Sequence, residues 1–262
     1  MKLKYPAKLI NKFKETFFML GIADWLYALI KRRKGYTEPE LNWGPEVVHF
    51  NEKEISWFCF VPRGVSKGSL LRKGIIPTEG KVFVYTFSSF NLIKPDLDET
   101  VEGLNEIYTD ATRRMYEELA NGHSLGMLGV SLGNVLAIRA SGSINSRIER
   151  LVSIVGGGKL GLSAWDSLLT GHIAKQSGCN FPEEYEKRLA VFSPVNYIDG
   201  LTANKISIKL GTMDLFIPYK HGQQLANALI ERGKKTSSKI DYKSYIGADH
   251  CAALVLSALE GI

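Results

Sequence analysis

The 262-residue sequence has few cysteines, no long uninterrupted apolar run and no recognisable nucleic-acid-binding motif. Its three cysteines, Cys59, Cys179 and Cys251, are scattered without metal-ligand spacing, which argues against a disulfide framework and predicts a reducing, cytoplasmic compartment. The apolar run over residues 17–30 contains an acidic residue and is shorter than the roughly 20 residues of a membrane-spanning helix. Nucleic acid is not an expected partner, since no zinc knuckle or aromatic-basic RNA motif is present.

Positive charge is concentrated near the start of the chain. The formal net charge is +6, and residues 1–34 carry nine Lys or Arg against two acidic residues, so the remainder is close to neutral. Apolar residues in this segment recur at helical spacing. We expect residues 1–36 to form a basic amphipathic helical extension. It either packs on the domain or makes a peripheral membrane contact through residues 1–34.

Residues 37–262 alternate between β-type runs and helical patterns. This alternation predicts an α/β domain with a mostly parallel central sheet and helices on both faces. Residues 51–54 are typical of a hairpin turn between the first two strands, and Asp98 or Thr100 is the expected cap of the first long helix. Strands are expected over 46–50, 55–61, 81–87, 123–130, 150–155, 205–210 and 240–245, and helices over 98–120, 134–140, 221–232 and 251–259.

The segment over about 159–203 interrupts the alternation. It holds two weak helical patches, over 163–175 and 183–192, instead of a strand. Insertions at the carboxyl ends of parallel strands lie where such folds bind ligands. We therefore expect a small helical lid above the sheet.

A serine in a glycine-rich turn is the first chemical signal. Gly129-Val130-Ser131-Leu132-Gly133 follows an expected strand and precedes an expected helix. A G-x-S-x-G motif has mechanistic meaning only in that setting, where the serine projects at a helix N-terminus. Ser131 is therefore the candidate nucleophile.

A serine hydroxyl needs a base, and an imidazole base needs an orienting carboxylate. His250 follows the strand expected over 240–245, and Asp214 follows the strand expected over 205–210. Asp249 is a rival carboxylate, but adjacent side chains tend to point apart. Asp214 is therefore the expected partner of His250.

These motifs resemble the α/β-hydrolase superfamily. The resemblance covers roughly residues 46–260 and rests on GVSLG at 129–133, GTMDLFIP at 211–218 and GADH at 247–250. It implies the α/β-hydrolase fold and a Ser131–His250–Asp214 triad. It is specific for fold and mechanism but not for substrate, because the superfamily also includes peptidases and lactonases.

The resemblance also implies an oxyanion hole. One donor would be the backbone N–H of Leu132, the residue after the nucleophile. The second would come from Gly64 or Val65, in the loop after the strand over 55–61, although Arg63 stands where the family often has histidine. A rival register places this donor in the loop after residues 81–87.

Three aromatic residues are candidates for an acyl pocket: Phe87, Phe90 and Trp165. Core or lid packing is the alternative for each. The expected chemistry requires neither a metal ion nor an organic cofactor.

The predicted activity is hydrolysis of a carboxylic ester through an acyl-enzyme. A thioesterase or an acyltransferase acting on lipid-like acyl groups is the nearest alternative. Two other classes stay open, a non-catalytic small-ligand-binding protein and a membrane-peripheral scaffold, because fold alone does not determine function.

Overall fold

One sheet organises the chain. The computed structural model describes residues 45–51, 53–62, 76–87 and 92–260, so the predicted extension over 1–36 lies outside the described residues. Within them, seven strands form a sheet in the order β1-β3-β2-β4-β5-β6-β7. Neighbouring strands are parallel except for β1 and β3, which are antiparallel. The strands are β1 (Glu46–His49), β2 (Ile55–Pro62), β3 (Lys81–Phe87), β4 (Ser124–Val130), β5 (Ile148–Ile154), β6 (Ala203–Gly211) and β7 (Lys239–Tyr245).

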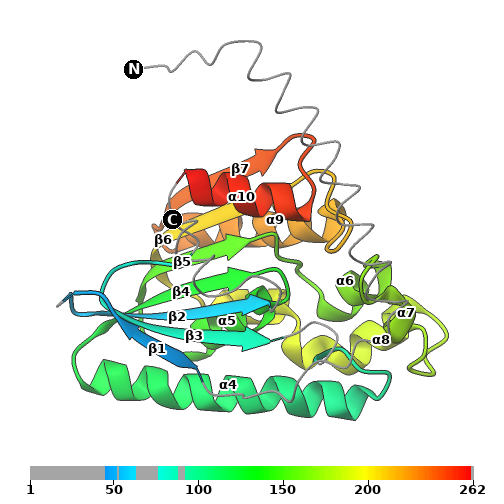
Figure 1. Cartoon of the computed structure of the whole chain (residues 1–262), viewed down its shortest axis with the longest axis horizontal. Coiled ribbons are helices and arrows are strands. Elements are labelled where there is room, and N and C mark those ends of the chain that lie inside the picture. The colour runs from blue at the N-terminus through cyan, green and yellow to red at the C-terminus, as the bar shows by residue number, and fades with distance from the viewer. Residues whose placement is uncertain (1–44, 52, 63–75, 88–91, 261–262) are drawn as a thin grey trace, which may run out of the picture.

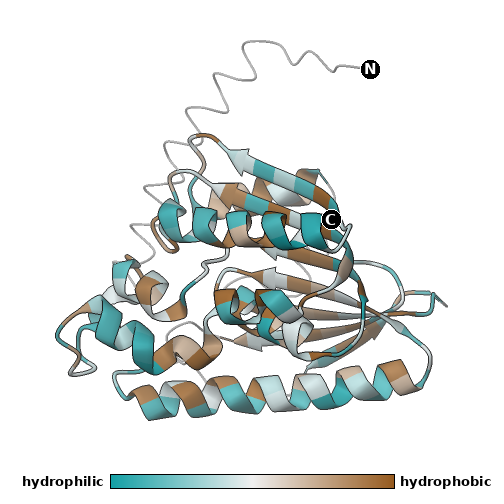
Figure 2. Cartoon of the chain, turned by 180° about the vertical axis from the view of Figure 1, so that it is seen from behind, coloured by the Kyte–Doolittle hydropathy of each residue, from teal (hydrophilic) through white to brown (hydrophobic). Residues whose placement is uncertain are grey.

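Both faces of the sheet are covered. Along β2, Phe58 and Phe60 face one apolar core, whereas Trp57 and Cys59 face the other, as the two-residue period of a strand requires. Helices α4, α5 and α9 pack into the first core and α10 packs into the second. The helices have these bounds: α4 (Leu97–Ala120), α5 (Gly133–Ser143), α9 (Tyr219–Lys235) and α10 (His250–Leu259). Figure 2 shows apolar central strands beside helices banded with polar and apolar residues.

The first two strands do not form the predicted hairpin, and this prediction was wrong. Strand β3 lies between β1 and β2, pairing with β1 on one side and β2 on the other. The reason is burial: β2 is apolar on both faces and belongs inside the sheet, whereas β1 is largely exposed and suits an edge. The turn is instead bound to the start of β3, since Gly80 N–H donates to the Asn51 side chain over 2.7 Å.

Helix α4 begins earlier than predicted. Its N-cap is Asp96, whose carboxylate accepts from the N–H groups of Asp98 and Glu99, so neither Asp98 nor Thr100 is the cap. Thr100 is fully buried, and its hydroxyl accepts from the Lys94 N–H instead. Asp98 lies inside the helix and Thr100 is bonded to Lys94, so Asp96 is the oxygen-bearing side chain that stands just before the first helical residue.

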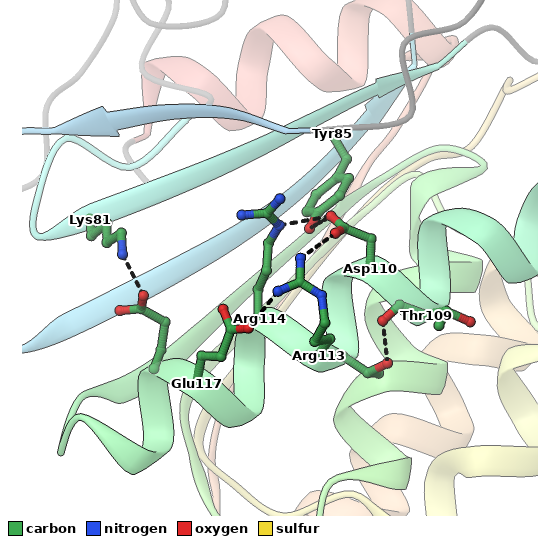
Figure 3. A network of polar contacts seen from close by, with 9 residues as sticks. Lys81, Tyr85, Thr109, Asp110, Arg113, Arg114 and Glu117 are labelled. Atoms are coloured by element: carbon green, nitrogen blue, oxygen red, sulfur yellow. Dashed lines mark hydrogen bonds and ion pairs between the residues drawn. The ribbon is translucent and has the colours of Figure 1, made fainter.

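Helix α4 is tied to β3 by the polar network in Figure 3. The Asp110 carboxylate accepts from the Tyr85 hydroxyl over 2.9 Å and from Arg113 and Arg114 over 2.7 and 2.8 Å. Burial raises the pKa of Asp110, but these hydrogen bonds outweigh it, so its pKa is lowered. Asp110 therefore stays ionised beside the sheet.

A group of short helices connects β5 to β6, in the place where an insertion was expected. Figure 1 shows α6, α7 and α8 together beyond the ends at which the parallel strand arrows point. A break after Asp166 splits the first predicted patch into two helices. The elements are α6 (Leu160–Asp166), α7 (Gly171–Ala174), α8 (Pro182–Leu189), η1 (Ala190–Phe192) and η2 (Pro194–Gly200). In the described part of the chain, no helix is long and apolar enough to cross a membrane.

Candidate active site

Ser131 lies in a strained turn between β4 and α5. Its φ is 53°, in the left-handed region that costs a non-glycine residue about 1–3 kcal/mol. The turn is tied to the neighbouring strand, since the Ser131 N–H donates to the Ile154 carbonyl over 2.9 Å. The next N–H groups, from Leu132 and Gly133, precede the hydrogen bonds of the helix. No described residue accepts a hydrogen bond from these two N–H groups, as is usual at the start of a helix.

The two motif glycines are needed because other backbone comes close to them. A Cβ on Gly129 would lie 2.7 Å from the Asn134 Cα, and a Cβ on Gly133 would lie 2.0 Å from the Phe60 carbonyl oxygen. Neither space can hold a methyl group without moving backbone. The motif therefore reflects close packing of the turn against β2 and α5.

Asn134 holds this turn, a role that no sequence pattern predicted. Its side-chain amide donates to the carbonyls of Ser131 and Ile154, each over 3.0 Å, and the side chain is fully buried. The bond joins the Ser131 turn to the end of β5. An amide directly before the apolar residues 135–138 was the available signal.

Asp214 and His250 form a buried pair. The Oδ2 of Asp214 lies 2.7 Å from the Nδ1 of His250, and both side chains are at most 5% exposed. The other oxygen, Oδ1, accepts from the N–H groups of Phe216 and Ile217, each over 2.8 Å. The backbone thus holds the carboxylate, and the carboxylate holds the imidazole.

The loops that carry this pair are bonded to each other. The Met213 N–H donates to the Ala248 carbonyl over 2.9 Å, and the Gly247 N–H donates to the Thr212 hydroxyl over 2.8 Å. The Phe216 ring packs against the His250 ring with centroids 5.2 Å apart. These contacts hold the loops after β6 and β7 in a fixed position relative to each other.

Asp249 has a different role from Asp214. Its carboxylate caps α10 by accepting from the Ala252 N–H over 2.8 Å. Burial raises its pKa, more than the bond from Ala252 lowers it. The preference for Asp214 over Asp249 thus agrees with the bond that His250 makes.

Two other histidines of the described chain, His123 and His221, have different partners. His123 lies 2.7 Å from the Glu118 carboxylate at the start of β4, and His221 lies 2.8 Å from Asp166 on α6. Neither is bonded to a residue of the Ser131 turn.

A small cavity opens beside Ser131. It holds about 40 Å³, whereas pockets for drug-sized ligands occupy about 300–1,000 Å³. Its walls come from the Ser131 turn, from α6 and the segment after it, and from the loop after β6. Its lining includes Ser131, Leu132, Val135, Ser163, Phe216 and Ile217.

Comparison of the sequence with known proteins finds nothing, whereas comparison of the structure does. No family model matches the chain, and no curated protein matches it. Among solved structures, TT1662 from Thermus thermophilus superposes with a TM-score of 0.58 and 17% identity, covering 86% of this chain and 94% of that one.

Two further structures are similar. Carboxyl esterase 2 from the fungus Tuber melanosporum has a TM-score of 0.52 and 14% identity, covering 88% of this chain and 91% of that one. A puromycin-hydrolyzing peptidase from Mycobacterium tuberculosis has a TM-score of 0.52 and 15% identity, covering 84% of this chain. This chain spans only 39% of that peptidase's length.

This chain has the α/β-hydrolase fold. The predicted fold class is thereby confirmed.

In the α/β-hydrolase fold, ligands bind at the carboxyl ends of the parallel strands, which is where the cavity lies. Leu132, the predicted first oxyanion donor, lines it. Gly64 and Val65, the predicted second donors, lie outside the described residues, as does Phe90.

The other two predicted pocket residues are packed elsewhere. Phe87 is fully buried in the first core, and the Trp165 ring lies against Tyr185 with centroids 5.7 Å apart. The described lining of the cavity beside Ser131 includes neither. Among the residues described, no three His, Cys, Asp or Glu side chains cluster in a way that could hold a metal ion.

Proposed function

We propose that this chain is a serine hydrolase of carboxylic esters, with Ser131 as nucleophile, His250 as general base and Asp214 as the acid that orients His250. One observation carries the proposal. The buried 2.7 Å hydrogen bond between Asp214 Oδ2 and His250 Nδ1 orients an imidazole at the sheet end that also holds the strained Ser131. A carboxylate on Nδ1 directs the Nε2 edge of the ring outward as the base.

In the proposed reaction, His250 Nε2 takes the Ser131 proton as Oγ attacks the ester carbonyl carbon. The tetrahedral oxyanion accepts hydrogen bonds from the Leu132 N–H and from a second donor expected at Gly64 or Val65. The C–O bond to the alcohol then breaks, and the alcohol leaves with the proton from His250. Water repeats the sequence on the acyl-enzyme, releasing the acid.

The mostly apolar and small cavity supports a short acyl group rather than a long one. Similar structures include an esterase and a peptidase, so the scaffold accommodates more than one leaving group. A thioester presents the same carbonyl chemistry and is the nearest alternative substrate.

The decisive experiment uses p-nitrophenyl esters and acyl thioesters of graded chain length on the wild type and Ser131→Ala. We expect turnover of short-chain esters by the wild type, none by Ser131→Ala, and labelling of Ser131 by a fluorophosphonate probe. Full esterase activity in Ser131→Ala contradicts the proposal. An unlabelled, inactive wild type would favour a non-catalytic ligand-binding protein.

Peripheral membrane contact through residues 1–34 stays a proposal, since these residues lie outside those described. Its support is their concentration of basic residues. Equal binding of the full chain and a 1–36 deletion to vesicles of anionic lipid would remove it.

A further inference from the structure

The segment between α6 and α7 forms one wall of the cavity beside Ser131. Three of its residues, Ser167, Leu169 and Thr170, line the cavity. Ser167 Oγ accepts from the N–H groups of Leu169 and Thr170 over 3.1 and 3.4 Å, which folds the segment into a tight turn. The Thr170 hydroxyl donates to the Ala164 carbonyl over 2.9 Å and joins this turn to α6. The position of the turn over 167–170 therefore decides how far the cavity extends on this side.

Asp166, the last residue of α6, attaches this turn to the start of α9. Its Oδ2 accepts from Lys220 Nζ over 2.6 Å and lies 2.8 Å from His221 Nε2. The His221 side chain is buried, and the His221 carbonyl accepts from the Gly158 N–H over 3.1 Å, so this partner is itself held in place. Burial raises the pKa of Asp166, but the hydrogen bonds from Lys220 and His221 outweigh it, and its pKa is lowered. Asp166 is therefore ionised and paired at neutral pH.

A backbone hydrogen bond joins the same turn to the loop that carries Asp214. The Leu168 N–H donates to the Leu215 carbonyl over 2.9 Å. Leu215 stands between Asp214, the partner of the imidazole, and Phe216, which lines the cavity. The wall is thus attached to α9 on one side and to the loop after β6 on the other. Of these two attachments, only the one made by Asp166 depends on a side chain.

We propose that Asp166 is a positioning residue that sets the length of the acyl group accepted beside Ser131. By holding the turn over 167–170 against α9, Asp166 keeps the cavity at about 40 Å³, which suits only a short acyl group. Without this attachment the turn can move away from the loop after β6, and the cavity lengthens on that side. The substrate class is therefore an ester of a short-chain acid, with the upper limit on chain length imposed through Asp166. This inference rests on the proposed ester hydrolysis at Ser131.

The test compares p-nitrophenyl acetate with p-nitrophenyl octanoate, which share a leaving group and differ in acyl length. The quantity measured is the ratio of kcat/KM for octanoate to that for acetate. Comparing this ratio between the wild type and Ασp166→Ala cancels the intrinsic reactivity of the two esters. Glu231→Ala is the matched control, because it also removes a carboxylate that pairs with a lysine of α9, in this case the exposed Lys234.

A second variant reaches the same contact from its other side. Lys220→Met/His221→Leu removes both partners and leaves Asp166 in place. Thermal unfolding establishes that each variant is folded at the assay temperature, and the ratio is then measured on each folded variant.

We expect the ratio to rise about tenfold or more in Asp166→Ala and in Lys220→Met/His221→Leu, since each methylene accommodated in an apolar pocket changes kcat/KM by about 10- to 200-fold. The ratio should stay at the wild-type value in Glu231→Ala. A purely structural role of Asp166 predicts that kcat/KM falls by the same factor for both esters, and that result overturns the proposal. An unchanged ratio in either folded variant, or the same rise in Glu231→Ala, also overturns it.

The two proposals fail in different ways. If a fluorophosphonate labels Ser131 and acetate is turned over with a ratio indifferent to position 166, only the role of Asp166 fails. If no ester is turned over and Ser131 is not labelled, the proposed function fails and takes the role of Asp166 with it.

Discussion

Each end of the parallel sheet holds a serine, a histidine and a carboxylate, yet the two groups are built differently. The amino-end cluster comprises Ser56, Lys81, Glu118 and His123, and the carboxyl-end cluster comprises Ser131, Asp214 and His250. In the amino-end cluster, Glu118 accepts from the Ser56 hydroxyl over 2.6 Å, lies 2.7 Å from His123 Nδ1 and pairs with Lys81. These contacts bind the start of β2, β3 and β4 to the end of α4.

The two clusters arrange the serine, histidine and carboxylate differently. In the amino-end cluster, His123 Nδ1 faces both the carboxylate and Ser56, which lies 3.1 Å away inside a regular strand with no exposed surface. In the carboxyl-end cluster, Asp214 is hydrogen-bonded to His250 Nδ1. Ser131 has a left-handed backbone conformation and lines a cavity. The two clusters share residue types, so the candidate site is distinguished by its backbone geometry and by the cavity beside Ser131.

The largest expected contrast is between the two serines. We expect Ser131→Ala to reduce kcat for ester hydrolysis by about 10⁴-fold or more, since no other group can form the acyl-enzyme. Ser56→Ala should leave kcat per folded molecule unchanged and lower the free energy of unfolding. Ester turnover and denaturant unfolding of both variants measure this. Comparable loss of kcat in Ser56→Ala would break the comparison.

The carboxylates give the next contrast. Asp214→Asn keeps the shape of the pair but favours the wrong imidazole tautomer, so we expect kcat to fall about 10³- to 10⁴-fold. Glu118→Gln should leave kcat within a factor of about two, because it lies at the other end of the sheet. Steady-state kinetics on a short-chain ester decide between these outcomes. A small effect of Asp214→Asn would remove it as the orienting acid.

Asn134→Ala tests whether the turn that carries Ser131 must be held in place for catalysis. It removes the bonds to the Ser131 and Ile154 carbonyls, so we expect about 10- to 100-fold lower kcat and about 2 kcal/mol less stability. Ser141→Ala, which removes a buried hydrogen bond on the same helix, is the control. It should lower stability but not kcat. Equal kcat losses in both variants would assign the effect to α5 as a whole.

The smallest effect is a pH dependence of the amino-end cluster. Burial raises the Glu118 pKa, but the hydrogen bonds from Lys81, Ser56 and His123 outweigh it, and the pKa is lowered in the folded state. A lowered carboxyl pKa stabilises the fold above the ordinary glutamate pKa, and that stability is lost as pH falls through the folded-state value.

Unfolding free energies between about pH 6 and about pH 3 measure this contribution. We expect about 1 kcal/mol of the wild-type loss over that interval to be absent in Glu118→Gln. Arg188→Gln, which alters the exposed ion pair with Asp98 at the start of α4, should leave the pH dependence of the unfolding free energy near that of the wild type. If Glu118→Gln leaves the pH dependence of the unfolding free energy unchanged, the amino-end cluster is not the source of that dependence.

Local patterns predicted most of the elements. Strands such as 81–87 and 240–245 were expected with the bounds that the structure has or within one residue of them. The turn at Ser131 was also predicted, because glycines on both sides of a serine between a strand and a helix indicate close backbone packing. The hairpin and the cap of α4 were wrong, since each depended on which neighbouring segment a residue would meet.

Some residues of the candidate site were predictable from the sequence and others were not. Asp214 and His250 were expected to meet because both follow parallel strands, and the structure brings them together at 2.7 Å. Asn134 was missed, since a buried amide is recognisable only when the carbonyls around it are known. Phe87 was offered as a pocket residue, but its place in the core depends on how α4 and α5 cover the sheet.

By itself, the sequence determined the alternation of strands and helices, the Ser131 turn and the order of serine, acid and histidine along the chain. These features depend on residue periodicity and on glycines within a few positions of each other. Only the tertiary structure decided that β3 separates β1 from β2 and that His250 bonds Asp214 while Asp249 caps a helix. Such choices follow from burial and hydrogen bonding between distant segments, which no local pattern contains.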